Sequence, residues 1–189
     1  NEQGPNFLYQ NFDGRFVDRA VEYGVDDARQ NGRGTALADI LYDGRLGIII
    51  GNWNGYHRAY VPARHSFLDY ATEAFREPSL VRTVISADFD NDGFDEIFFN
   101  NIGQPNRMFR VRDGGVLEPV ALSAALEADG LGTGAAVADM DGDGVLDLLV
   151  AHGESAPQPL SLFRAAIDGP GRYLRIAPLT GQGAPARGA

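Results

Sequence analysis

The chain is organised around two acidic stretches: Asp88-Phe89-Asp90-Asn91-Asp92-Gly93-Phe94-Asp95-Glu96 and Asp139-Met140-Asp141-Gly142-Asp143-Gly144-Val145-Leu146-Asp147. Each stretch carries carboxylates at its first, third, fifth and ninth positions, a glycine at its sixth, and a residue at its seventh that offers a backbone carbonyl. Calcium takes about six to eight oxygen ligands in a flexible cage, and glycine permits the sharp turn that lets alternate side chains point inward. The pattern therefore predicts a calcium-binding turn in each stretch.

Neither stretch is an EF-hand. That motif places a bidentate glutamate at its twelfth position and a helix on either side. Phe99 and Val150 stand at the twelfth position here, and an apolar run follows each stretch at once. The alternative is a pair of plain Asx-turns, but such turns do not require four carboxylates within nine residues. We therefore expect calcium-binding turns between two β-strands, and not Mg²⁺, which keeps its waters.

The charge of the chain is concentrated in these turns. The 189 residues carry a formal net charge of −10, and the two stretches hold nine of the 26 acidic residues. Without a cation, the carboxylates of each stretch would repel one another at short range. This distribution argues against nucleic acid or an anionic membrane as the main partner.

Composition also indicates the size class of the protein and its cellular compartment. A hydrophobic content of 44% and the length of 189 residues fit one globular domain with a substantial core. The chain has no cysteine, which excludes disulfides and thiolate sites. No signal peptide and no apolar run long enough for membrane insertion appear in the given residues, so we expect that a secreted protein is present here in a mature or excised form. Weak calcium turns fill where Ca²⁺ is about millimolar, so we expect a secreted, extracellular or periplasmic protein.

The acidic turns belong to an internal repeat. Asp39, Asp88 and Asp139 begin equivalent segments at spacings of 49 and 51 residues, each preceded by small residues and followed by an apolar strand. Two further strands in each unit also align, so each unit of roughly 50 residues holds about four short strands. Units of this kind are typical of the blades of a β-propeller. A solenoid or a sandwich is the alternative.

The repeat gives an all-β fold of about three and a half blades. We expect a half blade at 6–20, blades at about 33–75, 82–122 and 133–177, a tail or the start of another module at 178–189, and a short helix between Asp69 and Glu77. Because open blade faces are liabilities, three explanations stay open: an excised fragment, a distorted small ring, or a homodimer that completes a seven-bladed ring.

No other motif predicts chemistry. The glycine-rich run at 130–134 opens a strand and not a helix, unlike a phosphate loop. His57, His65 and His152 lack metal-ligand spacing, and no serine has a nucleophile-elbow context. We therefore expect no enzyme and no catalytic or cofactor-binding residue. The alternative function is a hydrolase or lyase with its active site in the propeller channel.

The repeats resemble a known family. The acidic turns between their strands resemble the FG-GAP/VCBS repeats of integrin α-subunit propellers. The segments at 6–16, 106–110, 171–176 and 186–189 are similar to the cartilage acidic protein family and its bacterial homologues, in which FG-GAP repeats run into a UnbV/ASPIC domain. The resemblance implies a bacterial homologue with an adhesion or interaction role, a calcium-stabilised propeller and an unknown protein or glycan ligand.

The resemblance also implies the ligands of two Ca²⁺ ions. Glu96 departs from the usual aspartate at the ninth position, and Asp95 competes with it. In the first unit Leu41 and Gly47 replace two ligands, so we expect a plain turn there. The predicted metal ligands are Asp88, Asp90, Asp92, the carbonyl of Phe94 and Glu96, and then Asp139, Asp141, Asp143, the carbonyl of Val145 and Asp147.

Overall fold

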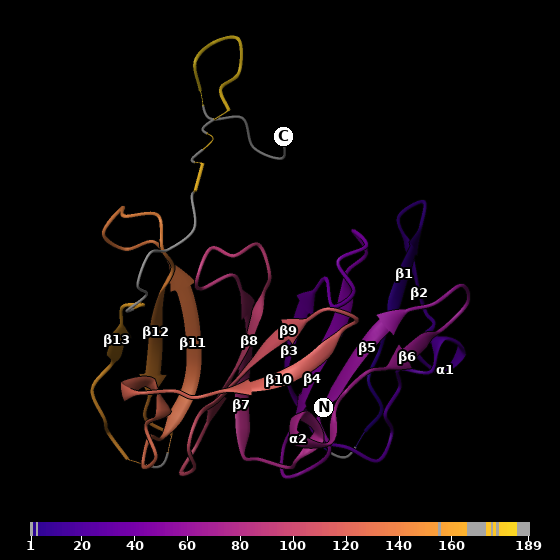
Figure 1. Ribbon diagram of the computed structural model, residues 1–189. Coiled ribbons are helices and arrows are strands. Elements are labelled where there is room, and N and C mark those ends of the chain that lie inside the picture. Colours follow the sequence, from indigo (N-terminus) through magenta and orange to yellow (C-terminus); the bar gives the residue numbers. More distant parts are fainter. Residues whose placement is uncertain are drawn as a thin grey trace.

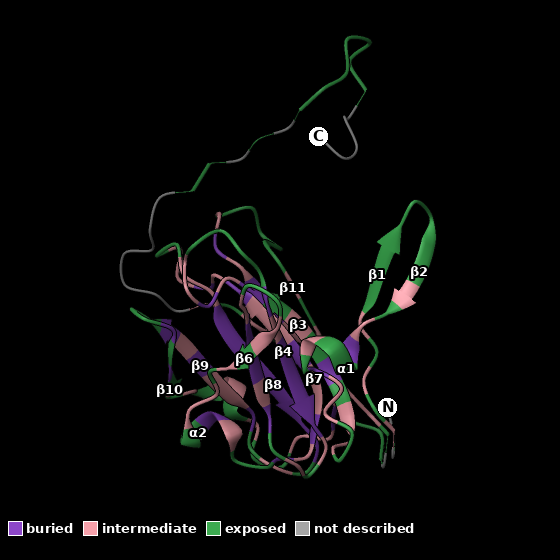
Figure 2. Cartoon of the chain, turned by 90° about the vertical axis from the view of Figure 1, so that its right-hand side faces the viewer, coloured by how far each residue is buried: buried purple, intermediate pink, exposed green. Residues whose placement is uncertain are grey.

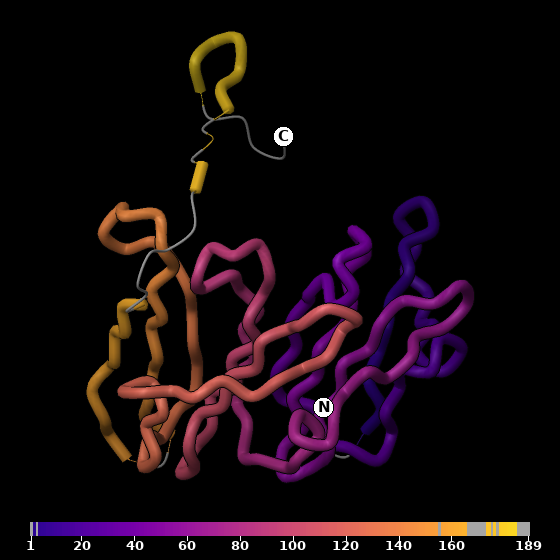
Figure 3. Tube along the Cα trace, viewed as in Figure 1, coloured from indigo at the N-terminus to yellow at the C-terminus, as the bar shows by residue number. Residues whose placement is uncertain are grey.

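The computed structural model describes residues 2, 4–154, 156–165, 173, 174, 176 and 178–184. This part of the chain is all-β, as predicted, with strands in four separate antiparallel sheets. The sheets follow one another across the molecule in sequence order, from the N-terminal hairpin to the third large sheet (Figure 3). No sheet closes on itself within the described residues.

Each sheet adds its strands in chain order (Figure 1). Among the described residues, the hairpin has two strands, sheets 1 and 2 have four, and sheet 3 has three. The hairpin comprises β1 (Tyr9–Phe12) and β2 (Arg15–Asp18); sheet 1 comprises β3 (Gly32–Ala38), β4 (Gly47–Asn52), β5 (Arg58–Pro62) and β6 (Phe67–Asp69); sheet 2 comprises β7 (Val81–Ala87), β8 (Glu96–Asn101), β9 (Arg107–Arg112) and β10 (Val116–Val120); sheet 3 comprises β11 (Gly132–Ala138), β12 (Asp147–His152) and β13 (Ser161–Phe163).

The first strands of the large sheets lie side by side, with β3 against β7 and β7 against β11. This contact explains their small residues. A Cβ added at Gly34 would meet the backbone nitrogen of Val84 at 2.7 Å, so only glycine allows that approach. Each first strand also carries the same one-residue bulge, at Arg33, Arg82 and Thr133.

The core lies between neighbouring sheets. Strand β8 is buried along its whole length (Figure 2). Because side chains alternate along a strand, Ile97 and Phe99 pack in the cluster that includes sheet 1 residues, whereas Phe98 packs with the sheet 3 residues Leu148 and Val150. A third cluster, around Ala20, Val25, Ile50 and Tyr60, joins the hairpin region to sheet 1.

In the part of the chain that the structure describes, three short helical turns connect the strands: α1 (Ala20–Tyr23), α2 (Glu73–Arg76) and the 3-10 turn η1 (Ala124–Leu126). Helix α2 confirms the helix predicted between Asp69 and Glu77, and the side chain of its N-cap Thr72 accepts the Phe75 N–H at 3.3 Å. Helix α1 and turn η1 were not predicted. Within the described residues, no helix is long and apolar enough to cross a membrane.

The C-terminal part differs from the expected blade. We predicted a fourth strand at 173–176, but Tyr173, Leu174 and Ile176 are in no strand, and Arg175 lies outside the described residues. The tail at 178–189 is described to residue 184, without a helix or named strand, and 185–189 lie outside the description. The number of blades therefore stays a prediction.

Candidate metal centres

Three equivalent turns join the first and second strands of the three large sheets. We call them loop A (39–47), loop B (88–96) and loop C (139–147). Neighbouring loops contact each other. The Tyr42 ring of loop A meets the Phe94 ring of loop B edge-on at 4.1 Å, and Asn91 Nδ2 of loop B donates to the Gly144 carbonyl of loop C at 2.8 Å. The acidic turns therefore form a row along one edge of adjacent sheets.

Loop B brings three carboxylates together. Asp88, Asp90 and Glu96 each offer an oxygen, and these oxygens all lie within 4.8 Å of one another. The fifth-position Asp92 is not in this group, and its Oδ1 accepts the Phe94 N–H at 2.9 Å. Three converging carboxylate oxygens fit a hard divalent cation such as Ca²⁺.

Glu96, and not Asp95, points into loop B. The two residues are adjacent on the chain and so point to opposite sides. Asp95 Oδ2 accepts the hydroxyl of Ser86 at 2.8 Å. Glu96 is only 2% exposed, and its Oε2 accepts the Phe89 N–H at 3.1 Å. Glu96 is therefore the ninth-position carboxylate available to an ion.

An arginine from the third strand of sheet 2 balances loop B. Arg110 Nε donates to Glu96 Oε1 at 3.0 Å, and its Nη2 pairs with Asp90. Burial raises the pKa of Glu96 to about 6, although the hydrogen bonds from Arg110 and Phe89 oppose this shift. The hydrogen bond to Glu96 raises the pKa of Arg110 in turn. Thus a protein cation already offsets part of the repulsion in this loop.

Loop C brings together a different set of positions. Asp139, Asp141 and Asp143 offer oxygens within 4.8 Å of one another, and all three residues are exposed. The ninth-position Asp147 is not in this group; it is 5% exposed and accepts the Met140 N–H at 3.1 Å. This bond is equivalent to the bond from Phe89 to Glu96. Loop C therefore also fits a calcium ion, with three carboxylates at the surface.

Loop A differs in composition although its course is the same. Asp39 accepts the N–H groups of Asp43 and Gly44 at 3.2 and 2.8 Å. Arg45 donates to the Asp43 carboxylate, and this hydrogen bond lowers the pKa of Asp43. Gly47 stands at the ninth position. Among the described residues of loop A, no group of three carboxylates forms. Loop A is therefore a turn without a cluster of metal-ligating side chains, as predicted.

The loops share backbone conformations that the sequence revealed only in part. The sixth position has positive φ in each loop, at Gly44 (+82°), Gly93 (+91°) and Gly144 (+86°). The fourth position also has positive φ, which we did not predict. Glycine and asparagine adopt positive φ readily, so the sequence indicates this conformation in two loops. Tyrosine rarely adopts it, so the sequence of the remaining loop gives no such indication. The fourth-position residues are Tyr42 (+54°), Asn91 (+55°) and Gly142 (+81°).

The two acidic loops lie within a recognisable repeat. The family described as FG-GAP-like repeat matches residues 88–150. This segment starts with loop B, includes loop C and ends in β12. FG-GAP repeats fit a β-propeller, as do the side-by-side sheets of this chain.

The whole chain, and not only this repeat, is similar to curated proteins. It is 52% identical to cartilage acidic protein 1 of Homo sapiens, and 51% identical to the proteins of the same name in Mus musculus and Xenopus tropicalis. Each alignment spans 202 positions and covers 100% of this chain but 31% of the relative. The chain thus spans about a third of the length of these relatives. The matched relatives are vertebrate proteins and lend no support to the expected bacterial homologue.

Proposed function

We propose that this chain is a calcium-binding, integrin-like β-propeller module for extracellular protein interaction or adhesion, and that it is not an enzyme. The FG-GAP-like repeat and the similarity to cartilage acidic protein 1 support this class of module. The proposed setting is secreted, extracellular or periplasmic, and the proposed partner is a protein or glycan. A homodimer is a further proposal for closing the ring.

One observation carries the proposal: loops B and C each bring three carboxylates within 4.8 Å at the same edge of neighbouring sheets. Ca²⁺ would supply positive charge at each group of carboxylates. The chain itself supplies the turn, the buried ninth-position carboxylate and the contacts between loops. The proposed ligands remain those predicted from the sequence, with Glu96 in preference to Asp95.

The contacts between loops suggest a structural, non-catalytic role for a bound ion in the docking of a partner. Loop A contacts loop B through Tyr42 and Phe94, and loop B contacts loop C through Asn91 and Gly144. An ion that restricts the motion of one loop would therefore also restrict the motion of its neighbour. A rigid row of loops loses less conformational entropy when a partner docks. We therefore propose that the ions shape the surface and that neighbouring loops contact the partner.

Thermal unfolding in excess calcium and in excess chelator tests the proposal. Each filled site should add about 3 kcal/mol when free Ca²⁺ is about 100 times the dissociation constant, so Tm should fall clearly in chelator. An unchanged Tm, with no heat of calcium binding by titration calorimetry, would disprove it.

The fifth position offers a matched set of variants. Asp92→Ala in loop B and Asp143→Ala in loop C should each reduce the calcium stoichiometry from two to one. Asp43→Ala in loop A is the control and should leave both sites intact, because loop A lacks two of the carboxylates. Equal losses in all three variants would show that the effect is general destabilisation.

A further inference from the structure

In each large sheet, one residue at or just after the third strand faces the ninth position of the loop. The register of the strand pairs gives this residue in each case. An arginine faces the ninth-position carboxylate of loop B and of loop C, whereas a valine faces the glycine of loop A. The opposed pairs are Arg110 and Glu96 in sheet 2, Arg164 and Asp147 in sheet 3, and Val61 and Gly47 in sheet 1. The arginine therefore accompanies the ninth-position carboxylate in both sheets.

Both arginines contact the carboxylates that converge in their loops. In loop B, Arg110 Nε donates to Glu96 Oε1 at 3.0 Å, and its Nη2 pairs with Asp90. In loop C, Arg164 Nη1 pairs with Asp141 Oδ2 at 2.9 Å. All three acceptors belong to the groups whose oxygens lie within 4.8 Å of one another. A guanidinium group and a divalent cation would therefore use the same carboxylates.

The two arginines differ in exposure. The side chain of Arg110 is 27% exposed, and its partner Glu96 is buried. The side chain of Arg164 is 67% exposed. Exposed ion pairs contribute little because water screens them, whereas charge-assisted hydrogen bonds are about twice as strong as neutral ones. Arg110 is therefore held more firmly by loop B than Arg164 is by loop C.

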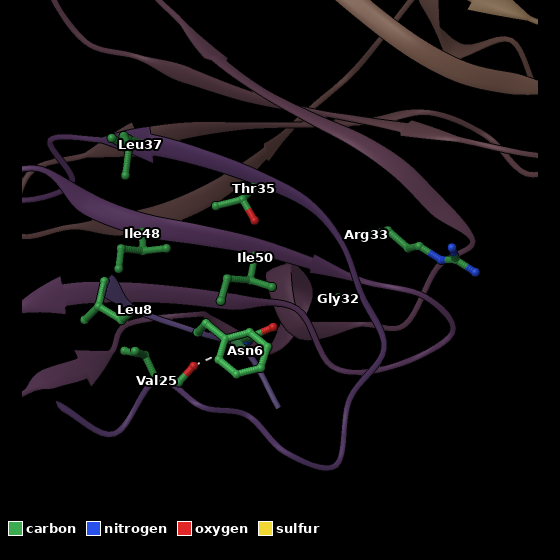
Figure 4. A pocket seen from close by; sticks show the side chains of 10 residues that line it. Asn6, Leu8, Val25, Gly32, Arg33, Thr35, Leu37, Ile48 and Ile50 are labelled. Atoms are coloured by element: carbon green, nitrogen blue, oxygen red, sulfur yellow. Dashed lines mark hydrogen bonds between the residues drawn. The ribbon is translucent and has the colours of Figure 1, made fainter. Parts of the chain in front are cut away.

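Arg110 borders a pocket that gives its side chain room to move. The pocket has a volume of about 240 Å³, and its lining includes the apolar side chains of Met108 and Phe163 from sheets 2 and 3. Arg164 borders the same pocket. The pocket in Figure 4 differs, because no carboxylate lines it and Arg33 points away from it. Arginine, converging carboxylates and free space thus occur together beside loop B.

We propose that Arg110 competes with Ca²⁺ for the carboxylates of loop B and so sets the calcium affinity of this loop. The guanidinium must leave Asp90 and Glu96, toward the adjoining pocket, before their oxygens can hold an ion. Loop B then fills at a higher calcium concentration than its carboxylates alone would require. Arg164 acts in the same sense on loop C, but more weakly. The inference rests on the proposed calcium binding.

Calcium titration calorimetry of single-site variants tests this inference. In the Asp143→Ala chain, which keeps loop B, Arg110→Gln should tighten calcium binding at least about tenfold, because hydrogen bonds from a charged group no longer oppose the ion. In the Asp92→Ala chain, which keeps loop C, Arg164→Gln is the matched control. It should tighten binding at most about fivefold, because its ion pair is exposed. Unchanged or weaker binding in Arg110→Gln, or equal gains from both substitutions, would overturn the proposal.

Nuclear magnetic resonance of the wild-type chain gives a second measurement that needs no substitution. The Arg110 Nε–H should exchange with solvent at least about tenfold faster in saturating calcium than in chelator, because it loses its acceptor on Glu96. If the chain binds calcium and this Nε–H stays protected, the inference fails alone. If the wild-type chain gives no heat of calcium binding, the proposed function fails and the inference fails with it.

Discussion

Sheets 1 and 2 have the same strand order, the same bulge and equivalent turns, yet they balance their acidic loops differently. In loop A, Arg45 within the turn pairs with Asp43. In loop B, three carboxylates converge and Arg110 reaches them from β9. Since loop A adopts positive φ at the same two positions without a group of three carboxylates, the turn itself does not depend on a metal.

The ninth position explains why the two loops are not interchangeable. A Cβ at Gly47 would meet the Tyr60 carbonyl oxygen at 2.5 Å, so loop A has no room for a ninth-position carboxylate. Sheet 2 accommodates Glu96 there and satisfies its carboxylate with Phe89 and Arg110. Packing around the second strand therefore decides which of these two loops can carry a carboxylate at its ninth position.

The largest effect is expected from Glu96→Ala. The substitution leaves the buried Phe89 N–H without its acceptor and removes one partner of Arg110. We expect a loss of about 2–3 kcal/mol in the free energy of unfolding, measured by urea titration in chelator. Glu96→Gln keeps an acceptor and should lose less. If Glu96→Ala were as stable as the wild type, the difference between Glu96 and Gly47 at the ninth position would contribute nothing to stability.

Sheets 1 and 2 differ again at His57, which is equivalent to Asn106. The Asn52 N–H donates to His57 Nδ1 at 3.0 Å, so Nε2 carries the proton and donates to Ser79 Oγ at 3.0 Å. Burial lowers the pKa of His57 to about 3. Only the unfolded chain then takes up this proton below about pH 6.5, so this contribution to stability is present above that pH and is lost on acidification.

Between about pH 6.5 and 5 the loss from His57 should be about 2 kcal/mol. Glu96 acts in the opposite sense, because its raised pKa favours the folded state as the pH falls. The measurement is therefore the difference in stability between wild type and His57→Asn at each pH, in chelator. His57→Asn introduces the residue that sheet 2 has at the equivalent position. It should remove the contribution of His57 to the loss of stability on acidification. Parallel curves for the two proteins would contradict this account.

A smaller effect, of opposite sign, is expected from Tyr42→Phe in loop A. Within the described structure the Tyr42 hydroxyl is buried without a hydrogen-bond partner, and burial raises its pKa above the usual range. Removing the hydroxyl should stabilise the chain by about 1 kcal/mol and keep the ring contact with Phe94. Chemical denaturation measures the change. A destabilised variant would mean that the hydroxyl is solvated.

The smallest effect is expected from Arg45→Ala. The Arg45–Asp43 pair is exposed, and ion pairs of this kind contribute little to stability. We expect no measurable change in Tm, and no change in calcium stoichiometry. A clear loss of stability would show that loop A depends on the positive charge of Arg45, as we infer that loop B depends on Arg110.

Much of the fold could be read from the repeat. The spacing of Asp39, Asp88 and Asp139 located the first and second strands of the three large sheets, because turn chemistry and apolar runs are local signals. The same signals located the acidic loops. They could not reveal that Asp92 and Asp147 lie outside the three-carboxylate groups, since side-chain direction depends on neighbouring backbone N–H groups.

By itself, the sequence determined the period of the repeat, the strand pairs and the acidic turns. These features depend on residues near one another in the chain. The tertiary structure alone decided that Glu96, and not Asp95, points into loop B, through Ser86 on the preceding strand and Arg110 on β9. It also decided the tautomer of His57. Those outcomes depend on which surfaces meet across sheets, and packing between distant segments sets them.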